Sequence, residues 1–410
     1  MRSPSHIVHL PIASPVSSKK YPLGLQRRHA FTLVEALLAT AISLVLLAVL
    51  LPAIQYSRER ARTSQCQDHL RQLGFAMSNY AQAFSVFPPA QGMSCNNYPS
   101  GDCQMTMNWC ISLLPYLDNA DTYNCYDQLA PFTDPSNAKA IARSIPSLIC
   151  PSTPRSSNLT SMEMTSMSIS NVVNSDPYEA SGNFIPYGLP ASATGGSADY
   201  VISSGVKASL MRLMFSSDSS VIARLTIDGT VRDSWGFGRP SEWMELTNLG
   251  YSSGGTTSIA TITDGTSNTT MLFELAGRNT VYHAGFRNLL NGPSNAPMFD
   301  LLEIENQLAF GGGMWADPAN GDYFVGGRVN RDGSGQHCGP YLVNKSNMRS
   351  SAAGGGSYYY GYGCGPYGFH RGGAQVLMCD GSVRMFSENM DGVTLCTLVG
   401  AQDALDPGGL

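Results

Sequence analysis

Charged residues are scarce in this chain. Asp, Glu, Lys and Arg make up 13% of its 410 residues, about half the share of roughly 25% in an average globular protein. The formal net charge is −5, which provides no basic surface to attract nucleic acid, so we expect no nucleic-acid partner. The length is nevertheless sufficient for a substantial core and for more than one domain.

Common signatures of catalytic and metal sites are missing as well. The chain contains no GxSxG, HExxH or P-loop sequence, and its ten cysteines form no CxxC pair and no Cys/His cluster at zinc spacing. Residues 363–368 spell GxGxxG, but this stretch does not lie between a strand and a helix, so it does not predict a nucleotide site. We therefore predict that the protein is not an enzyme and has no catalytic residue and no cofactor.

An apolar run without any charge extends from residue 36 to residue 54. As a helix it would cover about 28 Å at roughly 1.5 Å per residue, close to the ~30 Å hydrocarbon thickness of a bilayer. A secretory signal peptide and a plain signal anchor are two alternative interpretations. The run is longer than a usual signal-peptide core, however, and no small-residue cleavage site follows it. Pro52 is expected to kink this helix and not to end it.

Glu35 precedes this run, and a carboxylate at membrane depth costs a few kcal/mol and usually marks a function. The stretch at residues 29–54, HAFTLVEALLATAISLVLLAVLLPAI, resembles the N-terminal segment of type IV prepilins and type II secretion pseudopilins. The resemblance implies that prepilin peptidase cuts between Ala30 and Phe31 and methylates the new amine. It also implies an assembly role for Glu35, which would neutralise the terminal amine of a neighbouring subunit. Ala30 stands where the family has glycine, a mild replacement with which we still expect cleavage.

The helical pattern continues beyond the apolar run. Apolar residues recur at alternating spacings of four and three, which predicts a helix face packed against a core: Cys66, Leu70, Leu73, Met77, Tyr80 and Phe84. A free coiled coil is the alternative. The charged residues are expected to lie off this stripe: Arg58, Glu59, Arg60, Arg62, Asp68 and Arg71. Pro88 and Pro89 should end the helix.

Four stretches, in order, resemble the pilin-like family of unknown function called DUF1559. They are residues 58–89, residues 148–154 (LICPSTP), residues 262–275 (ITDGTSNTTMLFEL) and residues 370–386 (HRGGAQVLMCDGSVRMF). The last stretch fits the family's C-terminal signature of a histidine, nine residues and then Asp-Gly. The resemblance spans nearly the whole chain. It implies an architecture and no established activity.

We predict an α+β, pilin-like fold in which a long N-terminal helix, membrane-spanning in its first half, packs on an antiparallel β-rich head. The predicted parts are a leader (1–30), an assembly helix (31–54), its amphipathic continuation (55–87) and an extracytoplasmic head (88–410). Candidate strands combine β-branched and aromatic residues with Gly or Asn punctuation. They lie at residues 198–205, 221–227, 269–275, 341–346, 374–379 and 382–387.

The C-terminal signature predicts a structural hairpin over residues 373–388. Asp380-Gly381 is a strong signal for a two-residue turn. Such a turn pairs Val376 with Met385 and gives one apolar face: Ala374, Val376, Met378, Val383 and Met385. In this register His370 lies far from Asp380, and we expect it to form a hydrogen bond near residues 389–391. We therefore assign His370, Asp380 and Gly381 structural roles and not a catalytic dyad.

Metal and disulfide sites are weakly indicated. Asp264, Ser267 and Asn268 offer oxygen ligands and make Asp264 and Asn268 weak calcium candidates, but an Asp-Gly turn before the strand at 269–275 is the favoured interpretation. The cysteines of an exported chain are better interpreted as disulfide partners than as metal ligands. Two pairs bracket loops and are candidate disulfides: Cys95 with Cys103, and Cys338 with Cys364. Cys379 is a candidate buried thiol.

These patterns favour a structural pilin-like or pseudopilin subunit, assembled with other pilin-like subunits in a type II secretion-like or type IV pilus-like system. Prepilin peptidase would be one partner and the inner membrane another. The protein would be single-pass with its head extracytoplasmic, and would reach the cell surface on assembly. Two other classes stay open, a membrane-anchored extracytoplasmic binding module that does not polymerise and a cell-surface enzyme with an unrecognised site. Assembly requires processing and Glu35, whereas the binding module requires neither.

Overall fold

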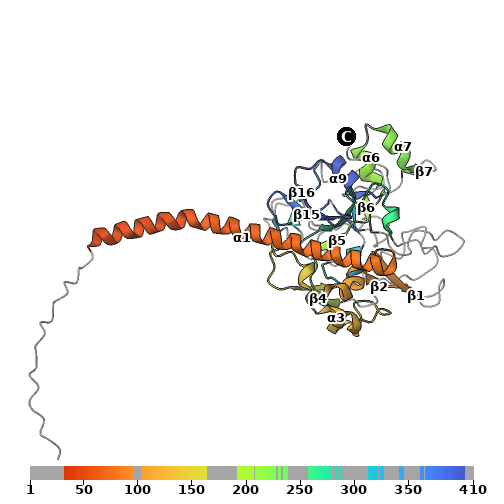
Figure 1. Cartoon of the computed structure of the whole chain (residues 1–410), viewed down its shortest axis with the longest axis horizontal. Helices are drawn as coiled ribbons and strands as arrows, with labels where there is room; N and C mark the ends of the chain where they lie inside the picture. Colours follow the sequence, from red (N-terminus) through yellow and green to blue (C-terminus); the bar gives the residue numbers. More distant parts are fainter. Residues whose placement is uncertain are drawn as a thin grey trace, which may run out of the picture. The chain divides into compact units, whose positions relative to one another are not determined.

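The computed structural model describes residues 32–95, 103–163, 192–206, 208–227, 230–231, 234–238, 257–278, 282–283, 287–288, 313–321, 323–326, 341–345, 361–363 and 365–401. The chain divides into two compact units, Met1–Tyr56 and Ser57–Leu410. The long helix α1 contributes residues to both units (Figure 1). The protein is therefore α+β, with a long apolar N-terminal helix and a sheet-containing head.

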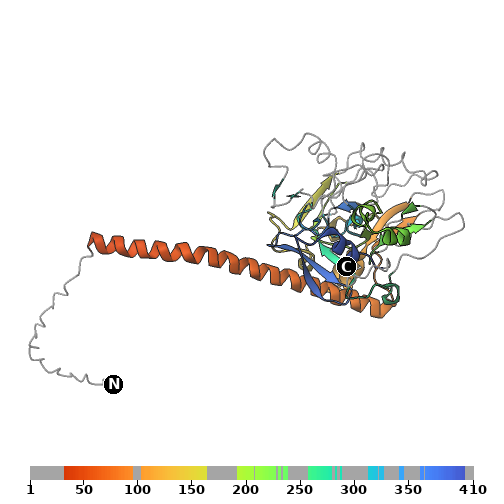
Figure 2. The same ribbon diagram turned by 90° about the horizontal axis from the view of Figure 1, so that it is seen from above.

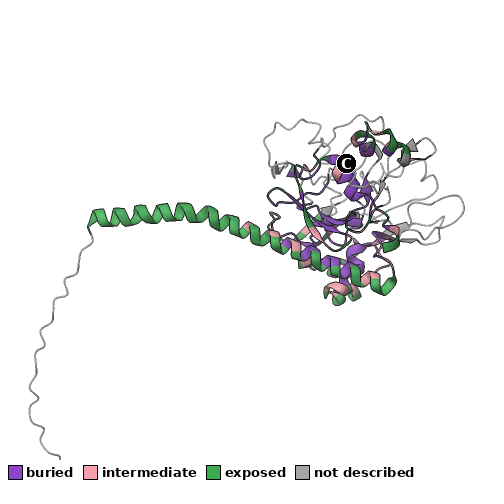
Figure 3. Ribbon diagram, turned by 45° about the horizontal axis from the view of Figure 1, so that its top comes forward, coloured by how far each residue is buried: buried purple, intermediate pink, exposed green. Residues whose placement is uncertain are grey.

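Helix α1 (Leu33–Phe84) continues through Pro52, as predicted. It ends where Ser85 takes a left-handed φ of 63° and donates its N–H to the Ala81 carbonyl (2.8 Å), just before Pro88 and Pro89. Every described residue of the first unit is exposed, and buried residues begin on the part of α1 that belongs to the head (Figure 3). Among the described residues this helix alone is long and apolar enough to cross a membrane, and by length and composition it could serve as an anchor or as a signal sequence.

The predicted apolar stripe packs into the core along most of its length. Its first four members are buried, Tyr80 is half-buried, and Phe84 at the end of the helix is 57% exposed. The buried face also takes in His69, Gly74 and Ala76. The interpretation of this stripe as a core-facing helix is thus confirmed, except at its last residue.

The main sheet has the strand order β16-β15-β10-β5, and all of its neighbours are antiparallel. Its strands are β5 (Tyr200–Ile202), β10 (Thr270–Glu274), β15 (Gly373–Met378) and β16 (Val383–Ser387). Strands β5, β10 and β15 are buried on both faces. Figure 2 gives a second view of this sheet beside α1.

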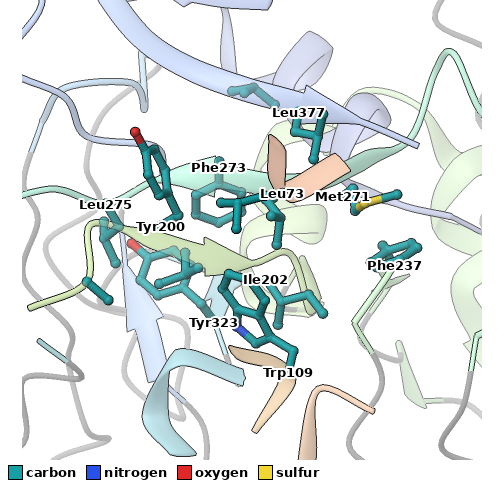
Figure 4. Packing of buried hydrophobic residues seen from close by; sticks show 14 of the residues in the cluster. Leu73, Trp109, Tyr200, Ile202, Phe237, Met271, Phe273, Leu275, Tyr323 and Leu377 are labelled. Carbon is teal, nitrogen blue, oxygen red and sulfur yellow. The ribbon is translucent and has the colours of Figure 1, made fainter. Parts of the chain in front are cut away.

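Helix α1 covers one face of the main sheet. Gln67 on the helix donates to Gln375 Oε1 (3.4 Å) on β15. A Cβ at Gly74 would lie only 3.1 Å from Leu377, so glycine allows the helix to approach the strand closely. The other face packs on aromatic residues: the rings of Phe273 and Tyr323 meet edge to face with centroids 5.2 Å apart (Figure 4).

A second sheet has the order β14-β13-β6-β9 and is mixed, which departs from the all-antiparallel expectation. Strand β13 runs parallel to both of its neighbours, and only β6 and β9 are antiparallel. Its strands are β6 (Gly205–Val206), β9 (Ser234–Trp235), β13 (Tyr323–Val325) and β14 (Gly361–Gly363). Parallel pairing joins segments that are distant in sequence, so alternation of residue types within a strand could not reveal it.

Short elements complete the described part of the head. Four two-stranded ribbons pair β1 (Gln91–Cys95) with β2 (Cys103–Asn108), β3 (Leu159–Glu163) with β4 (Ser192–Gly196), β7 (Thr226–Ile227) with β8 (Thr230–Val231), and β11 (Tyr282–His283) with β12 (Arg287–Asn288). The α-helices are α2 (Trp109–Leu113), α3 (Ala120–Cys125), α4 (Ala138–Ile141), α6 (Ala208–Met214), α7 (Ser219–Leu225) and α9 (Gly392–Val399). The 3₁₀ helices are η1 (Leu114–Leu117), η2 (Pro146–Leu148), η3 (Ile259–Thr261) and η6 (Pro318–Gly321).

Two predicted strands are wrong. Most of residues 221–227 belong to α7. Its N-cap is Asp218, whose side chain accepts the N–H groups of Ser220 and Val221. This N-terminal cap outweighs the β-branched content of the segment. Residues 341–345 form a turn with one isolated bridge, between Tyr341 and Asp391.

The C-terminal hairpin forms between β15 and β16, but its register differs from the predicted one by a residue. Val376 lies opposite Arg384, not Met385, because the loop has three residues. Gly381 N–H donates to the Met378 carbonyl (3.0 Å), and Gly381 itself takes a φ of +83°, the geometry of a turn followed by a one-residue bulge. The slip reverses the faces of β16. Its buried side chain is Phe386, whereas Met385 is 40% exposed.

Candidate functional site

Helix α1 begins with a reciprocal pair of hydrogen bonds. Thr32 N–H donates to Glu35 Oε2 (2.9 Å), and Glu35 N–H donates to Thr32 Oγ1 (3.3 Å). This is a capping box, so Glu35 has a local role in starting α1 that the sequence analysis did not consider. The predicted processing residues, Ala30 and Phe31, lie outside the described residues.

The C-terminal signature separates into two unrelated environments. Asp380 shapes the hairpin loop, where its Oδ1 accepts the Ser382 N–H (2.8 Å). His370 lies at 0% exposure and contacts Glu59 on α1 instead. The two signature residues thus have separate partners. The expectation that His370 bonds near residues 389–391 is wrong.

The weak calcium candidates lie in a turn. Asn268 N–H donates to the Gly265 carbonyl (3.0 Å), and Asn268 Nδ2 donates to the Asp264 carbonyl (3.3 Å). Gly265 takes a φ of +92°, which the turn requires. These bonds fit the Asp-Gly turn that the sequence favoured at this position.

The structure brings together four buried side chains that the sequence analysis did not connect. Cys66, Cys150, Glu274 and His370 each direct a potential ligand atom toward the others, and all four atoms lie within 4.8 Å of one another. His370 Nε2 is 3.5 Å from Cys150 Sγ and 3.6 Å from Glu274 Oε1. We call these four residues the buried cluster. Thiolate, imidazole and carboxylate groups are the usual protein ligands of transition metals.

Two members of the buried cluster come from regular elements on facing surfaces. Cys66 is on α1, and Glu274 is the last residue of β10, on the face of the main sheet that α1 covers. Residues directly opposite each other share a face, and Glu274 lies opposite Tyr200 on β5. Tyr200 Oη in turn lies 3.0 Å from Cys66 Sγ. The Gln375 N–H holds Glu274 Oε2 at 3.0 Å.

The other two members come from loops that buried polar groups fix. The Cys150 N–H donates to Asp199 Oδ2 (2.7 Å), a carboxylate at 0% exposure. One residue earlier, the Ile149 carbonyl accepts from His69 Nδ1 on α1 (2.9 Å). His370 lies just before β15 in the chain, and its Nδ1 contacts the helix. The buried cluster therefore joins α1 to the sheet and to both loops.

The hydrogen bonds around His370 define its tautomer. Its Nδ1 lies 3.0 Å from Glu59 Oε1 and 3.2 Å from Thr63 Oγ1. The Thr63 hydroxyl proton is already donated to the Glu59 carbonyl (2.9 Å), so this oxygen accepts from His370. With two acceptors beside it, Nδ1 carries a proton in the neutral ring as well as in the charged one. The Nε2 atom then faces the other members of the buried cluster.

Comparison with known proteins identifies the family. The family model described as "Protein of unknown function (DUF1559)" matches residues 55–392, most of the chain. The chain belongs to the DUF1559 family. Searches of curated proteins and of solved structures gave no match.

Each residue of the buried cluster lies in a different one of the four stretches that carry the DUF1559 resemblance. Cys66 lies in 58–89, Cys150 in 148–154, Glu274 in 262–275 and His370 in 370–386. The stretches are far apart in the sequence, and the fold brings them to one point. In this DUF1559 protein the buried cluster is therefore formed by residues from all four stretches that resemble the family.

The electrostatics of the buried cluster favour a negative charge on Cys66 beside a positive charge on His370. Burial would raise the pKa of Cys66, but hydrogen bonds with Cys150 and His370 and the positive charge of His370 lower it to about 6. Burial would lower the pKa of His370, but its bond to Cys66 and the charge of Glu274 raise it to about 9. Burial and the charge of Cys66 raise the pKa of Glu274 to about 8. Burial, with its bond to Cys66, raises the pKa of Cys150 well above its usual value.

One sequence signal could have extended the site. Glu59 precedes Cys66 by seven residues and Thr63 precedes it by three, so both share its helix face. The prediction that Glu59 lies off the stripe is therefore wrong, and the structure places it against His370. A carboxylate and a cysteine one heptad apart on a core-facing stripe are an unusual combination. They indicate that the stripe holds more than packing residues.

Proposed function

We propose that this DUF1559 protein is a pilin-like structural subunit whose N-terminal helix assembles with the helices of other subunits. The exposed apolar first part of α1, with Glu35 at its start, is the observation that supports the proposal. Such a surface requires a membrane or other helices to cover it. In the membrane-inserted precursor the segment acts as a single-pass anchor, and prepilin peptidase releases the leader between Ala30 and Phe31.

The capping box makes the role of Glu35 testable. Both Thr32 bonds to the carboxylate end on Oε2, and a glutamine at this position would keep them, because capping boxes accept Gln as well as Glu. Only the charge would be lost. In the proposed assembly that charge neutralises the terminal amine of the next subunit, where an unpaired charge in low dielectric is costly.

The experiment compares two variants of the full chain in its own membranes. Glu35→Gln keeps the cap and removes the charge, and it should abolish cross-linked oligomers or filaments. Thr32→Ala removes the hydroxyl of the cap and keeps the charge, and it should assemble as the natural protein does. Equal assembly of the Glu35→Gln variant would refute the charge-pair role.

The N-terminal residue of the purified protein tests processing separately. Mass spectrometry should find a chain that begins at a methylated Phe31. An intact Met1, or a cut beyond Ile54, would contradict the pilin-like proposal. A processed chain that stays monomeric would favour the alternative, an anchored binding module in the extracytoplasmic space. The proposal gives the head no catalytic role, and it places the subunit in a secretion-like or pilus-like system of the inner membrane.

A further inference from the structure

The spacing of the buried cluster matches one tetrahedral metal ion. In a tetrahedron with ordinary zinc bond lengths, a thiolate sulfur and an imidazole nitrogen lie about 3.6 Å apart, and a nitrogen and a carboxylate oxygen about 3.4 Å apart. The corresponding distances from His370 Nε2 are 3.5 Å to Cys150 Sγ and 3.6 Å to Glu274 Oε1. The fourth donor, Cys66 Sγ, lies within 4.8 Å of the other three.

A buried oxygen without a partner points independently to a ligand. Glu274 is fully buried, and its Oε2 accepts the Gln375 N–H, but Oε1 has no hydrogen-bond partner among the described residues. An unpaired carboxylate oxygen in the interior carries its full desolvation cost. This oxygen is the one that faces His370 Nε2. A cation between the two atoms would satisfy both.

The surrounding residues orient the donors as the outer shell of a metal site does. Glu59 and Thr63 accept from His370 Nδ1 and leave Nε2 for a ligand bond. A carboxylate behind a ligating histidine fixes the ring and increases its basicity. Ser152 donates to the same Glu59 oxygen (2.9 Å) and holds the carboxylate in place. Tyr200 Oη lies 3.0 Å from Cys66 Sγ, where it can stabilise a thiolate.

We propose that Cys66, Cys150, Glu274 and His370 bind one divalent transition-metal ion of the zinc class in a closed, structural site. Two sulfur donors and an imidazole favour such an ion over calcium or magnesium, which prefer oxygen ligands alone. All four donors come from the protein and all are buried, so no coordination position faces solvent. The ligands carry three negative charges when bound, the same as the three thiolates of a Cys₃His zinc site.

The site would act as a clamp within the head, between its part of α1 and the main sheet with two loops. One ligand lies on the helix, one on β10, and two in loops that the fold holds by separate contacts. Metal binding to such a set adds to folding stability directly, because the unfolded chain does not present the four donors together. This role concerns the folding of the head and is independent of whether subunits assemble.

Two alternative roles for the same residues, a disulfide and a catalytic pair, account for fewer of the observed contacts. A disulfide between Cys66 and Cys150 would leave Glu274 Oε1 without a partner and would give the Glu59–His370 contact no purpose. A catalytic Cys66–His370 pair would need a path for substrate, yet both side chains are at 0% exposure. The disulfide is the competitor that the experiment must separate from the metal site.

The first measurement uses the natural full chain, purified in detergent without chelators. Elemental analysis should find close to one zinc-class ion per chain. Replacement by Co²⁺ should give the visible bands of tetrahedral cobalt together with sulfur-to-cobalt charge transfer in the near ultraviolet. Absence of metal, or a peptide in which Cys66 is linked to Cys150 by a disulfide, would overturn the proposal.

The second measurement uses variants matched for burial. Cys150→Ala and Glu274→Gln should lower the metal content well below one ion per chain. Cys110→Ala removes another fully buried thiol, outside the buried cluster, and should leave the metal content unchanged. Metal retained in all three variants would place the ion elsewhere and refute the assignment. If a variant does not fold, the cobalt spectrum of the natural chain still decides the matter.

Discussion

Asp199→Asn is expected to destabilise the head strongly, because this buried carboxylate joins three segments. Its oxygens accept the N–H groups of Cys150 (2.7 Å) and Gly277 (2.9 Å) and the hydroxyl of Thr153 (3.2 Å). They also pair with the Arg155 guanidinium, whose side chain is 16% exposed. Asparagine presents an NH₂ group to one set of donors and removes the countercharge of Arg155.

The expected magnitude follows from the loss of one partner in a buried ion pair. Such a loss costs about 3–5 kcal/mol. A folded unit of about 350 residues has an unfolding entropy of roughly 0.7 kcal/mol/K near its melting temperature. A loss of about 4 kcal/mol should therefore lower Tm by about 5–6 °C. Because Trp109 and Trp315 are buried, their fluorescence can report the transition.

An exposed ion pair provides the matched control. Arg71 contacts Asp68 at 2.6 Å on the surface of α1, and the two side chains are 48% and 62% exposed. Surface pairs contribute only about 0–1 kcal/mol, so Asp68→Asn should change Tm by less than about 1.5 °C. If Asp199→Asn changes Tm no more than Asp68→Asn does, the carboxylate does not hold these segments together and the reasoning fails.

Three further predictions test other parts of the fold. Phe386→Ala should lower the free energy of unfolding by about 3–5 kcal/mol, and Met385→Ala should lower it much less. The reverse order in a denaturant titration would contradict the three-residue loop and favour the predicted two-residue loop. Asp391→Ala should cost about 1 kcal/mol, because its side chain caps α9 through the Thr394 N–H. Hydrogen bonds from Thr394 lower the pKa of Asp391, so this stabilisation is present above its usual pKa and should vanish as pH falls through the lowered value. Cys95 lies opposite Cys103 in the β1–β2 register, so non-reducing peptide mapping should find them linked, and separate peptides would contradict this.

The long helix was predictable because its signals are local. An uncharged apolar run and a stripe at spacings of four and three depend on neighbours within two turns. The end of α1 followed in the same way from Pro88 and Pro89. The strands that the sequence predicted correctly, at 269–275, 374–379 and 382–387, combine β-branched residues with a nearby Asp-Gly turn. Where a helix cap competed, as Asp218 does before α7, strand content alone gave the wrong element.

The hairpin register shows how one backbone conformation decides many contacts. Asp-Gly predicts a turn, but it does not distinguish a two-residue loop from a three-residue loop that ends in a glycine bulge. The bonds of Met378 to Gly381 and Ser382 select the longer loop. That choice buries Phe386 and exposes Met385, which the alternation of apolar residues could not decide because both are apolar.

The buried cluster escaped the sequence analysis because metal sites are recognised by short spacings. Its members are separated by 84, 124 and 96 positions, as their residue numbers give, whereas zinc signatures rest on pairs two to five residues apart. Only the tertiary fold brings these residues together, through α1 on one face of the main sheet. Cysteines of an exported chain usually form disulfides, and in the sequence only loop-bracketing pairs are evident partners, so nothing in it marks Cys66 and Cys150 as ligands.

A stabilising cross-link between helix and head suits a chain of this design. Residues on α1 from Glu59 to Met77 contact the main sheet and the loops beside it, and Cys66 of the buried cluster lies in the N-terminal part of that interval. Without a bound metal ion, the contacts there are polar and partly without hydrogen bonds, as at Glu274 Oε1. The proposed metal ion would make this weak part of the interface its strongest, because four bonds would then connect α1, β10 and two loops at one point. Loss of metal should consequently loosen the helix near Glu59 before it disturbs the apolar contacts around Leu73, and hydrogen exchange of the α1 amides should report that order.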